Sequence, residues 1–192
     1  MPCQFEVTRR VEFSETDMAG IMHFSNYFRF METAESGFFR SIGLSVVLSR
    51  SGLAVGLPRV HAECDYQVPL RFEDEVLVRL LVEKKSARSL SYQFRFYRLN
   101  GSARQLVARG RVTAVCTARQ PDGSLKAVAL PQAVADQIQV APAELLAQDS
   151  RGPERPASVS PARASHPQAP ATLRPKHQPA VRRTRPTNRL PL

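Results

Sequence analysis

The chain has 192 residues and a mass of 21.4 kDa; 43% of its residues are hydrophobic and 23% are charged. These proportions are typical of a soluble globular protein, and the length leaves room for one domain with a core and an additional segment. The formal charge of +10 divides into about +8 on residues 151–192 (9 basic minus 1 acidic) and about +2 on residues 1–150 (18 minus 16). The positive charge therefore gives no reason to expect specific nucleic-acid binding by the folded part.

Several classes of protein are excluded by simple patterns. No apolar run approaches the roughly 20 residues that cross a bilayer, and residues 1–5 lack the charged and apolar parts of a signal peptide. The three cysteines are an odd number and widely spaced, which argues against a disulfide framework. The scattered histidines and cysteines show no zinc-site spacing. We expect a cytoplasmic protein with no metal, no other cofactor and no transmembrane segment.

The C-terminal segment is rich in proline and arginine. Residues 151–192 hold nine of the fifteen prolines and no aromatic residue, which leaves too little apolar surface to offset the entropy cost of ordering. We predict a folded domain at 1–140 and a disordered basic tail at 141–192. Three uses of the tail remain open: an extension without strong function, a weak contact with nucleic acid or anionic lipid, or a proline-rich motif for a protein partner.

The folded part reads as a strand, a helix and a run of strands. Alternating apolar residues predict strands at Phe5–Phe13, Val60–Val68, Val76–Val82, Ser89–Leu99 and Leu106–Cys116. Asn100 and Gly101 form a hairpin signal between the last two strands. Pro131–Ile138 is expected to form a short closing helix.

One strongly apolar helix is predicted between the first two strands. Ser25 or Asn26 is suited to begin it, and Gly43 is suited to follow its end. Its apolar residues recur at steps of three and four: Phe24, Phe28, Met31, Ala34, Phe38 and Ile42. These elements predict an α+β domain in which a curved antiparallel sheet wraps around the helix. The outer sheet face also carries apolar residues, so we expect part of it to meet a second subunit: Leu77, Leu81, Val107 and Val115.

The stretch from Glu15 to Tyr27 is the most informative in the chain. It places Asp17 in a loop that ends at a helix N-terminus, where backbone N–H groups lack partners and the helix dipole is positive. Such N–H groups polarise a carbonyl oxygen or hold an oxyanion, and a carboxylate beside them acts as a base or a nucleophile. Gly20 allows a ligand to approach the backbone closely. Acyl transfer needs neither a metal nor a redox cofactor beyond this arrangement.

This stretch resembles the hotdog-fold acyl-CoA thioesterases of the 4-hydroxybenzoyl-CoA thioesterase type. The resemblance is carried by Asp17, Gly20, the pair Asn26-Tyr27 and the Phe-rich helix, and it extends over about residues 5–138, including the Tyr, Pro and acidic turn of residues 66–75. It implies a hotdog fold, with a curved antiparallel sheet around one long central helix. It also implies hydrolysis of an acyl- or aroyl-CoA thioester to the free acid and CoA, so that CoA is part of the substrate.

The resemblance also implies roles for individual residues. Asp17 matches the catalytic carboxylate, as a nucleophile or as a general base for water. The backbone N–H of Phe24 matches the amide that binds the thioester carbonyl. Gly20 matches the loop glycine, and Asn26 and Tyr27 match the helix-entry residues.

Two further sets of residues are less closely matched. One branch of the family has a histidine seven residues after the catalytic carboxylate; here that position is Phe24, and His23 lies one residue earlier. We therefore expect His23 to line the substrate pocket rather than to act as an acid or base. Lys84, Lys85 and Arg88 cluster near a predicted turn, about where the family places contacts to the CoA phosphates.

Alternatives remain open at this stage. Glu35 is the second candidate for the catalytic carboxylate, and Glu32 and Glu35 either form a polar helix face or meet the active site of a neighbouring subunit. The resemblance implies a homodimer or homotetramer with the pocket between two subunits. A non-enzymatic module that binds an acyl group or acyl-CoA and is localised by the basic tail is the alternative function. A dehydratase that pairs His23 with Glu35 is a third, and the acyl group is not specified.

Overall fold

The structure is a computed structural model, and it describes residues 1–148. Within this range the strands are β1 (Gln4–Arg10), β2 (Arg59–Tyr66), β3 (Glu75–Lys85), β4 (Ser89–Asn100), β5 (Ala103–Val115), β6 (Thr117–Arg119) and β7 (Leu125–Ala127). The helices are α1 (Asn26–Ser41), α2 (Gln132–Ala135) and α3 (Ala143–Ala147), and single 3-10 turns are η1 (Phe13–Glu15) and η2 (Leu48–Ser51). Residues 149–192 lie outside the described part. The disorder predicted for them and the three uses of the tail therefore stay predictions.

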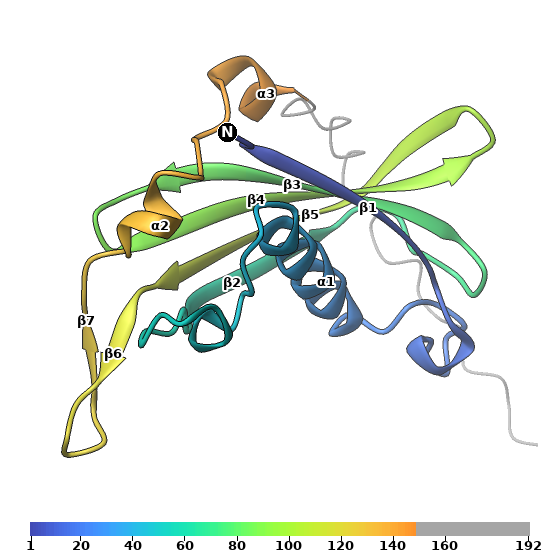
Figure 1. Ribbon diagram of the computed structural model, residues 1–192. Coiled ribbons are helices and arrows are strands. Elements are labelled where there is room, and N and C mark those ends of the chain that lie inside the picture. The colour runs from blue at the N-terminus through green and yellow to red at the C-terminus, as the bar shows by residue number, and fades with distance from the viewer. Residues whose placement is uncertain (149–192) are drawn as a thin grey trace, which may run out of the picture. The chain divides into compact units, whose positions relative to one another are not determined.

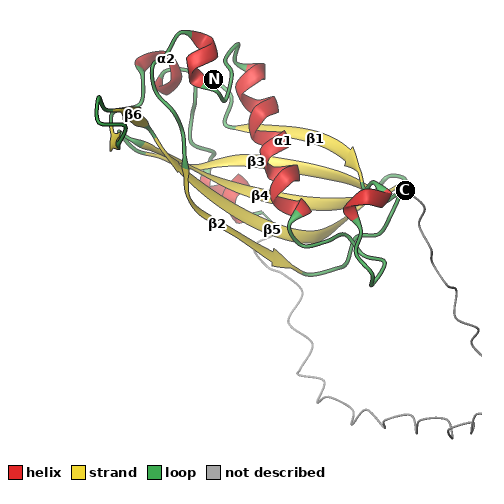
Figure 2. Cartoon of the chain, turned by 90° about the horizontal axis from the view of Figure 1, so that it is seen from below, coloured by secondary structure: helices red, strands yellow, loops and turns green. Residues whose placement is uncertain are grey.

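An antiparallel sheet of five strands, in the order β1-β3-β4-β5-β2, covers one side of α1 (Figures 1 and 2). The helix packs chiefly against β1 and β3, while β2 forms the opposite edge of the sheet. Strands β6 and β7 form a separate hairpin. The predicted α+β architecture, a curved antiparallel sheet around one long helix, is confirmed.

The first strand is shorter than predicted. Its pairing with β3 ends at Arg10, opposite Glu75, and the chain then turns into η1. Arg9, which interrupts the apolar face in the sequence, has a structural role there. Its guanidinium lies 4.2 Å from the centroid of the Phe30 ring and pairs with Glu15 at 3.1 Å, so its charge is balanced and its stem covers the helix.

The helix begins and ends where the sequence predicts, but its buried face is rotated. Gly43, with φ 73°, follows the helix as expected. The fully buried aromatic residues are Phe30, Phe38 and Phe39, whereas Phe24 is 60% exposed and lies before the first turn. The glycine at position 37 is required by packing, because a Cβ there would collide with the ring of Phe5 on β1.

The outer face of the sheet exposes fewer apolar residues than expected, and contact of part of it with a second subunit stays a prediction. Leu77 and Leu81 are already buried within one chain, and Val107 belongs to the inner core because the pairing of β4 with β5 shifts register beside it. Figure 1 shows α3 on the sheet face opposite α1. The side chain of Arg95 donates to the carbonyls of Leu145 and Leu146 at 2.8 Å. The folded part therefore continues beyond the predicted boundary at 140.

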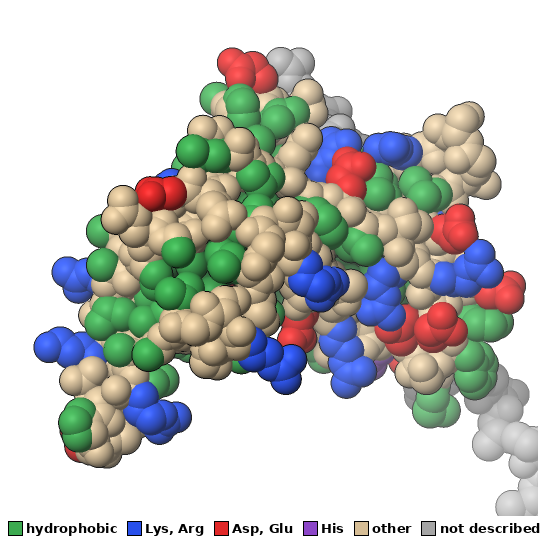
Figure 3. Space-filling model, in the orientation of Figure 1, with side chains coloured by type: hydrophobic (Ala, Val, Ile, Leu, Met, Phe, Trp, Pro, Cys, Tyr) green, Lys and Arg blue, Asp and Glu red, His purple; other side chains and the backbone are tan. Residues whose placement is uncertain are grey.

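The described surface is mixed in charge. Basic and acidic side chains lie close together over the right-hand half of the face in Figure 3, whereas apolar side chains gather on the left. Within residues 1–148, no helix is long and apolar enough to cross a membrane. The cysteines at positions 3, 64 and 116 are free thiols.

Candidate active site

A hollow of about 490 Å³ lies where the loop before α1 meets the segment that follows β2. It is mostly apolar and contains one carboxylate, that of Asp17. Its lining residues are Asp17, Ile21, Met22, Phe24, Tyr27, Tyr66, Gln67, Val68 and Pro69. The hollow is thus lined by residues from two segments that carry the family resemblance. One is the stretch from Glu15 to Tyr27, and the other runs from Tyr66 to Pro69.

The position of Asp17 is fixed by a tight turn of the backbone. Its N–H donates to the carbonyl of Ile21 and its carbonyl accepts from Gly20, both at 2.9 Å. Its Oδ1 accepts the N–H of Ala19 at 2.8 Å, which holds the carboxylate near its own backbone. Gly20 has φ 70°, a conformation that favours glycine, so this residue shapes the turn.

The backbone around Phe24 presents a free donor. The N–H groups of Met22 and His23 donate to the carbonyls of Leu70 and Glu15 at 2.8 and 2.9 Å. Within residues 1–148, the N–H of Phe24 has no acceptor, and it stands at the start of α1, where the helix dipole is positive. A carbonyl oxygen in the hollow would find both this donor and the Asp17 carboxylate nearby.

Two of the predicted site residues support the loop rather than line the hollow. The side-chain amide of Asn26, buried in the first turn, donates to the carbonyl of Glu15 at 2.8 Å. Nδ1 of His23 lies 2.8 Å from the hydroxyl of Ser25, and its ring lies against that of Phe24 with centroids 4.4 Å apart. Asp17, Phe24 and Tyr27 therefore line the same hollow, whereas His23 and Asn26 do not line it.

The predicted phosphate contacts lie far from this hollow within one chain. Lys84 and Lys85 end β3, and Arg88 lies in the turn before β4. Strand β3 begins near the hollow and spans about 33 Å. In Figure 1 this turn is at the left, beside α2, while the loop after β1 is at the right. Lys85 is also engaged, because its Nζ donates to the carbonyls of Ala135 and Ile138 at 2.7 Å. Contact with CoA phosphates through these residues stays a prediction, and it requires another subunit.

Tyr66 is the site residue that sequence reasoning missed. Its ring meets that of Tyr27 with centroids 4.9 Å apart, and its hydroxyl donates to the carbonyl of Phe24 at 3.3 Å. Burial raises the pKa of Tyr27 to about 12, and burial likewise raises the pKa of Tyr66 to about 12, so both phenols remain neutral donors at physiological pH. Position 66 belongs to the segment of residues 66–75 that carries the resemblance, but the alternation of its strand indicates a core residue and assigns it no part in the site.

A second cavity, of about 250 Å³, lies further along the same gap between α1 and β2. Glu35 lines it and is 2% exposed, and one of its carboxylate oxygens pairs with Arg59 at the start of β2. Burial raises the pKa of Glu35, and this effect outweighs the attraction of Arg59. Within one chain, this second candidate carboxylate is thus separate from the hollow around Asp17.

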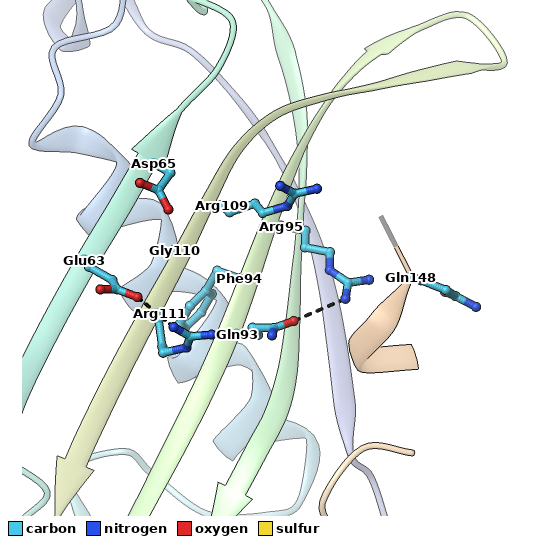
Figure 4. A pocket seen from close by; sticks show the side chains of 9 residues that line it. All are labelled: Glu63, Asp65, Gln93, Phe94, Arg95, Arg109, Gly110, Arg111 and Gln148. Carbon is cyan, nitrogen blue, oxygen red and sulfur yellow. Dashed lines mark hydrogen bonds and ion pairs between the residues drawn. The ribbon is translucent and has the colours of Figure 1, made fainter. Parts of the chain in front are cut away.

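A third hollow, of about 210 Å³, lies on the outer sheet face and is polar (Figure 4). There the Arg111 side chain donates to both Glu83 and Glu63 at 2.8 to 3.0 Å, and Arg95 donates to Gln93 at 3.2 Å. Arg111 thus joins β5 to its neighbour β2 and, across β4, to β3, whereas the contact between Arg95 and Gln93 lies within β4. Among residues 1–148, no group of three or more His, Cys, Asp or Glu side chains is placed to hold a metal ion.

Comparison with known proteins identifies the family. The profile of the Thioesterase-like superfamily matches residues 11–138, which include all of α1 and every strand of the five-stranded sheet except β1. The chain belongs to this superfamily. The hotdog thioesterase fold and the reaction class expected from the sequence, hydrolysis of a thioester, are thereby confirmed.

Individual relatives agree with this assignment. A provisionally named esterase from Aquifex aeolicus (strain VF5) is 41% identical over 91 residues, which are 47% of this chain and 70% of the relative. A 1,4-dihydroxy-2-naphthoyl-CoA hydrolase from Prochlorococcus marinus (strain NATL1A) is 36% identical over 97 residues, 47% of this chain and 65% of the relative. The crystal structure of a 1,4-dihydroxy-2-naphthoyl-CoA thioesterase from Synechocystis has a TM-score of 0.62 and 28% identity, covering 70% of this chain and 94% of that one.

Proposed function

We propose that this member of the thioesterase superfamily hydrolyses an acyl- or aroyl-CoA to the free acid and CoA in the hollow around Asp17. The observation that carries this proposal is the combination, in one hollow, of a carboxylate and an unpaired N–H at the start of a helix. The N–H of Phe24 donates a hydrogen bond to the thioester carbonyl oxygen and stabilises the oxyanion that forms on attack. Asp17 either attacks the carbonyl carbon or removes a proton from the attacking water.

The apolar walls of the hollow favour an acyl group with an aromatic or aliphatic body. Phe24, Tyr27 and Tyr66 present aromatic surface, and hydrophobic walls with a few polar groups are typical of small-molecule sites. No cofactor has a part in the proposed reaction, in which CoA is the leaving group. A cytoplasmic location remains a prediction that accords with the three free thiols.

We further propose that two copies of the chain pair through β2. This strand of eight residues forms an edge of the sheet, and it exposes 63% of Val60 and 47% of Tyr66. A long open edge with apolar side chains is a template for pairing with another strand. Antiparallel pairing with a second β2 would join the two sheets into one. It would also cover the gap between α1 and β2 in each chain. Sedimentation of the full chain tests this proposal, since a monomer at micromolar concentration contradicts it.

The activity is tested by the release of free thiol from a panel of acyl-CoAs that covers benzoyl, hydroxybenzoyl and short, medium and long aliphatic groups. Asp17→Asn keeps the shape of the side chain and removes the carboxylate, and we expect kcat to fall at least about 100-fold. Asp136→Asn, at the end of α2, is the matched control and keeps full turnover. Turnover by Asp17→Asn close to that of the wild type contradicts the assignment, and binding of acyl-CoA without turnover favours the binding module.

A further inference from the structure

The polar hollow on the outer sheet face brings together charges from three neighbouring strands, β4, β5 and β2. It lies on the face of the sheet opposite α1, and its volume is about 210 Å³. Two side-chain amides belong to its polar lining as well. The charged and amide lining residues are Glu63, Asp65, Gln93, Arg95, Arg109, Arg111 and Gln148.

Most of these charges already have partners within the fold. Arg111 donates to Glu83 and Glu63 at 2.8 to 3.0 Å, so its charge is shared by two carboxylates. Arg95 is 2% exposed and donates to the carbonyls of Leu145 and Leu146 at 2.8 Å. These contacts hold the two guanidinium groups in place at the rim and the floor of the hollow.

Arg109 is the charge that the fold leaves unsatisfied. Within residues 1–148 its Nη2 is buried and has no hydrogen-bond partner, and its guanidinium forms no ion pair. In the sheet register it stands between Asp65 on β2 and Arg95 on β4. Figure 4 shows its guanidinium on the side of Arg95 and directed away from Asp65.

This arrangement is unfavourable without a ligand. Like charges at directly opposed positions of adjacent strands repel each other, and Arg95 and Arg109 are such a pair. A buried charged donor without an acceptor costs further free energy. An anion in the hollow would relieve both effects at once, because it accepts from Nη2 of Arg109 and screens the two guanidinium groups from each other.

We propose that the hollow on the outer sheet face binds a small oxyanion, a phosphate or a carboxylate group, with Nη2 of Arg109 as its donor. The planar guanidinium group matches the oxygens of both kinds of anion. The volume of about 210 Å³ is sufficient, since a cavity of about 150 Å³ holds a benzene molecule, and these groups are no larger. The site is separate from the hollow around Asp17 and does not depend on the proposed thioesterase activity.

Calorimetric titration of the full chain with inorganic phosphate, at constant ionic strength, tests the site directly. We expect one saturable binding event that Arg109→Gln weakens at least about tenfold, because a hydrogen bond from a charged donor is lost. Arg109→Lys keeps the charge without the planar fork and should recover part of the affinity. Arg104→Gln, at an exposed position of the same strand, is the matched control and should bind as the wild type does.

Equal affinity of the wild type and Arg109→Gln for phosphate overturns the proposal, and would mean that a bound water satisfies Nη2. The basic residues of the segment 151–192 attract phosphate in every variant. Only the binding that is lost in Arg109→Gln therefore counts as the proposed site.

Thermal unfolding provides a second measurement that needs no binding heat. A ligand of the folded state raises the midpoint of unfolding as its concentration increases. We expect phosphate to raise the midpoint of the wild type more than that of Arg109→Gln, relative to sodium chloride of the same ionic strength. Equal shifts in the two proteins would reduce the effect of phosphate to its general action on protein surfaces and overturn the site.

Two further titrations identify the source of the oxyanion. Phosphate and acetate are compared on the wild type, and the tighter of the two names the group that the hollow prefers. Asp149 follows Gln148 directly in the sequence, so Asp149→Asn tests whether a carboxylate of the chain itself competes. An affinity for phosphate that is unchanged in Asp149→Asn supports a site for a free anion. Phosphate binding that appears only in Asp149→Asn would overturn it.

Discussion

The two long sides of α1 are packed in different ways. Toward β1, Gly37 lets the ring of Phe5 contact the helix backbone, and Arg9 covers Phe30. Toward β2, the helix leaves a gap that holds both the hollow around Asp17 and the cavity around Glu35. The packed side therefore stabilises the domain, whereas the open side contains the unpaired polar groups and the exposed aromatic surface that a substrate needs.

The largest effect expected on the open side is a loss of activity after removal of one backbone donor. Phe24→Pro eliminates the N–H that we assign to the oxyanion, and we expect kcat to fall about 100- to 1,000-fold. Phe24→Ala keeps the N–H, so its kcat should fall less than about tenfold. Both are measured by thiol release, with circular dichroism as the control for folding. Equal losses in the two variants would mean that the ring of Phe24, and not its N–H, is required.

On the packed side, the corresponding substitution should affect stability. A methyl group at position 37 collides with the ring of Phe5, so we expect Gly37→Ala to lower the free energy of unfolding by about 1–3 kcal/mol. Urea unfolding measures this change. Gly56→Ala, where an added Cβ would meet its neighbours only at an ordinary van der Waals distance of 3.9 Å, separates the effect of the collision from the general cost of replacing glycine. A Gly37→Ala variant as stable as the wild type would show that β1 moves freely against the helix.

The buried carboxylate on the open side should make stability depend on pH. Burial raises the pKa of Glu35 above its ordinary 4.5, so the folded state holds this proton more tightly than the unfolded chain. The stabilisation is full below pH 4.5 and is lost as the pH rises through the folded pKa. The free energy of unfolding of the wild type should therefore fall, relative to Glu35→Gln, as the pH rises above about 4.5. Arg59, Glu32 and Tyr92 face position 35 in both proteins, so the difference between them reports the titration of Glu35. Plots of the free energy of unfolding against pH that run parallel for the two proteins would contradict the raised pKa.

The smallest effect is expected from an unpaired hydroxyl on β4. Tyr92→Phe removes a buried hydroxyl that has no partner, so the free energy of unfolding should stay the same or rise by up to about 1 kcal/mol. Chemical denaturation measures the change, and Tyr97→Phe provides a comparison at another buried tyrosine of β4. A loss of more than about 1 kcal/mol in Tyr92→Phe would indicate that a bound water satisfies the hydroxyl.

The sequence was sufficient for the elements whose periodicity is undisturbed. The strands of the sheet, the start of α1 and the left-handed Gly43 follow from local patterns. The sequence is less informative about apolar residues that border the gap between α1 and β2. Phe24 and Phe28 continue the apolar stripe of the helix, yet they line the hollow and the cavity. A periodic pattern reports that a side chain avoids water, and it does not distinguish a core from a binding site.

Site residues contributed by distant segments were likewise beyond the sequence. Asp17 and Phe24 lie in one local motif, so their association with a helix N-terminus could be predicted. Tyr66 reaches the same hollow only because β2 ends beside the start of α1, and the unpaired oxygen of Glu35 depends on Arg59 and on the packing of β4. The charged residues at the end of β3 show another limit of the sequence, which does not reveal that they lie at the end of the sheet away from the hollow; their contact with CoA phosphates stays a prediction.

The register of β2 has a consequence for the choice of substrate. Its pairing with β5 shifts between Arg59 and His61, and such an irregularity at a sheet edge limits sliding of any strand added there. A slip of two residues between paired β2 strands would displace the partner's cavity between α1 and β2 by about 7 Å, close to the width of an aromatic ring. If the two subunits share each substrate, the length of the acyl group that fits is set by strand register. Sequence changes in β2, far from the reacting carbonyl, would then retune the specificity of the enzyme.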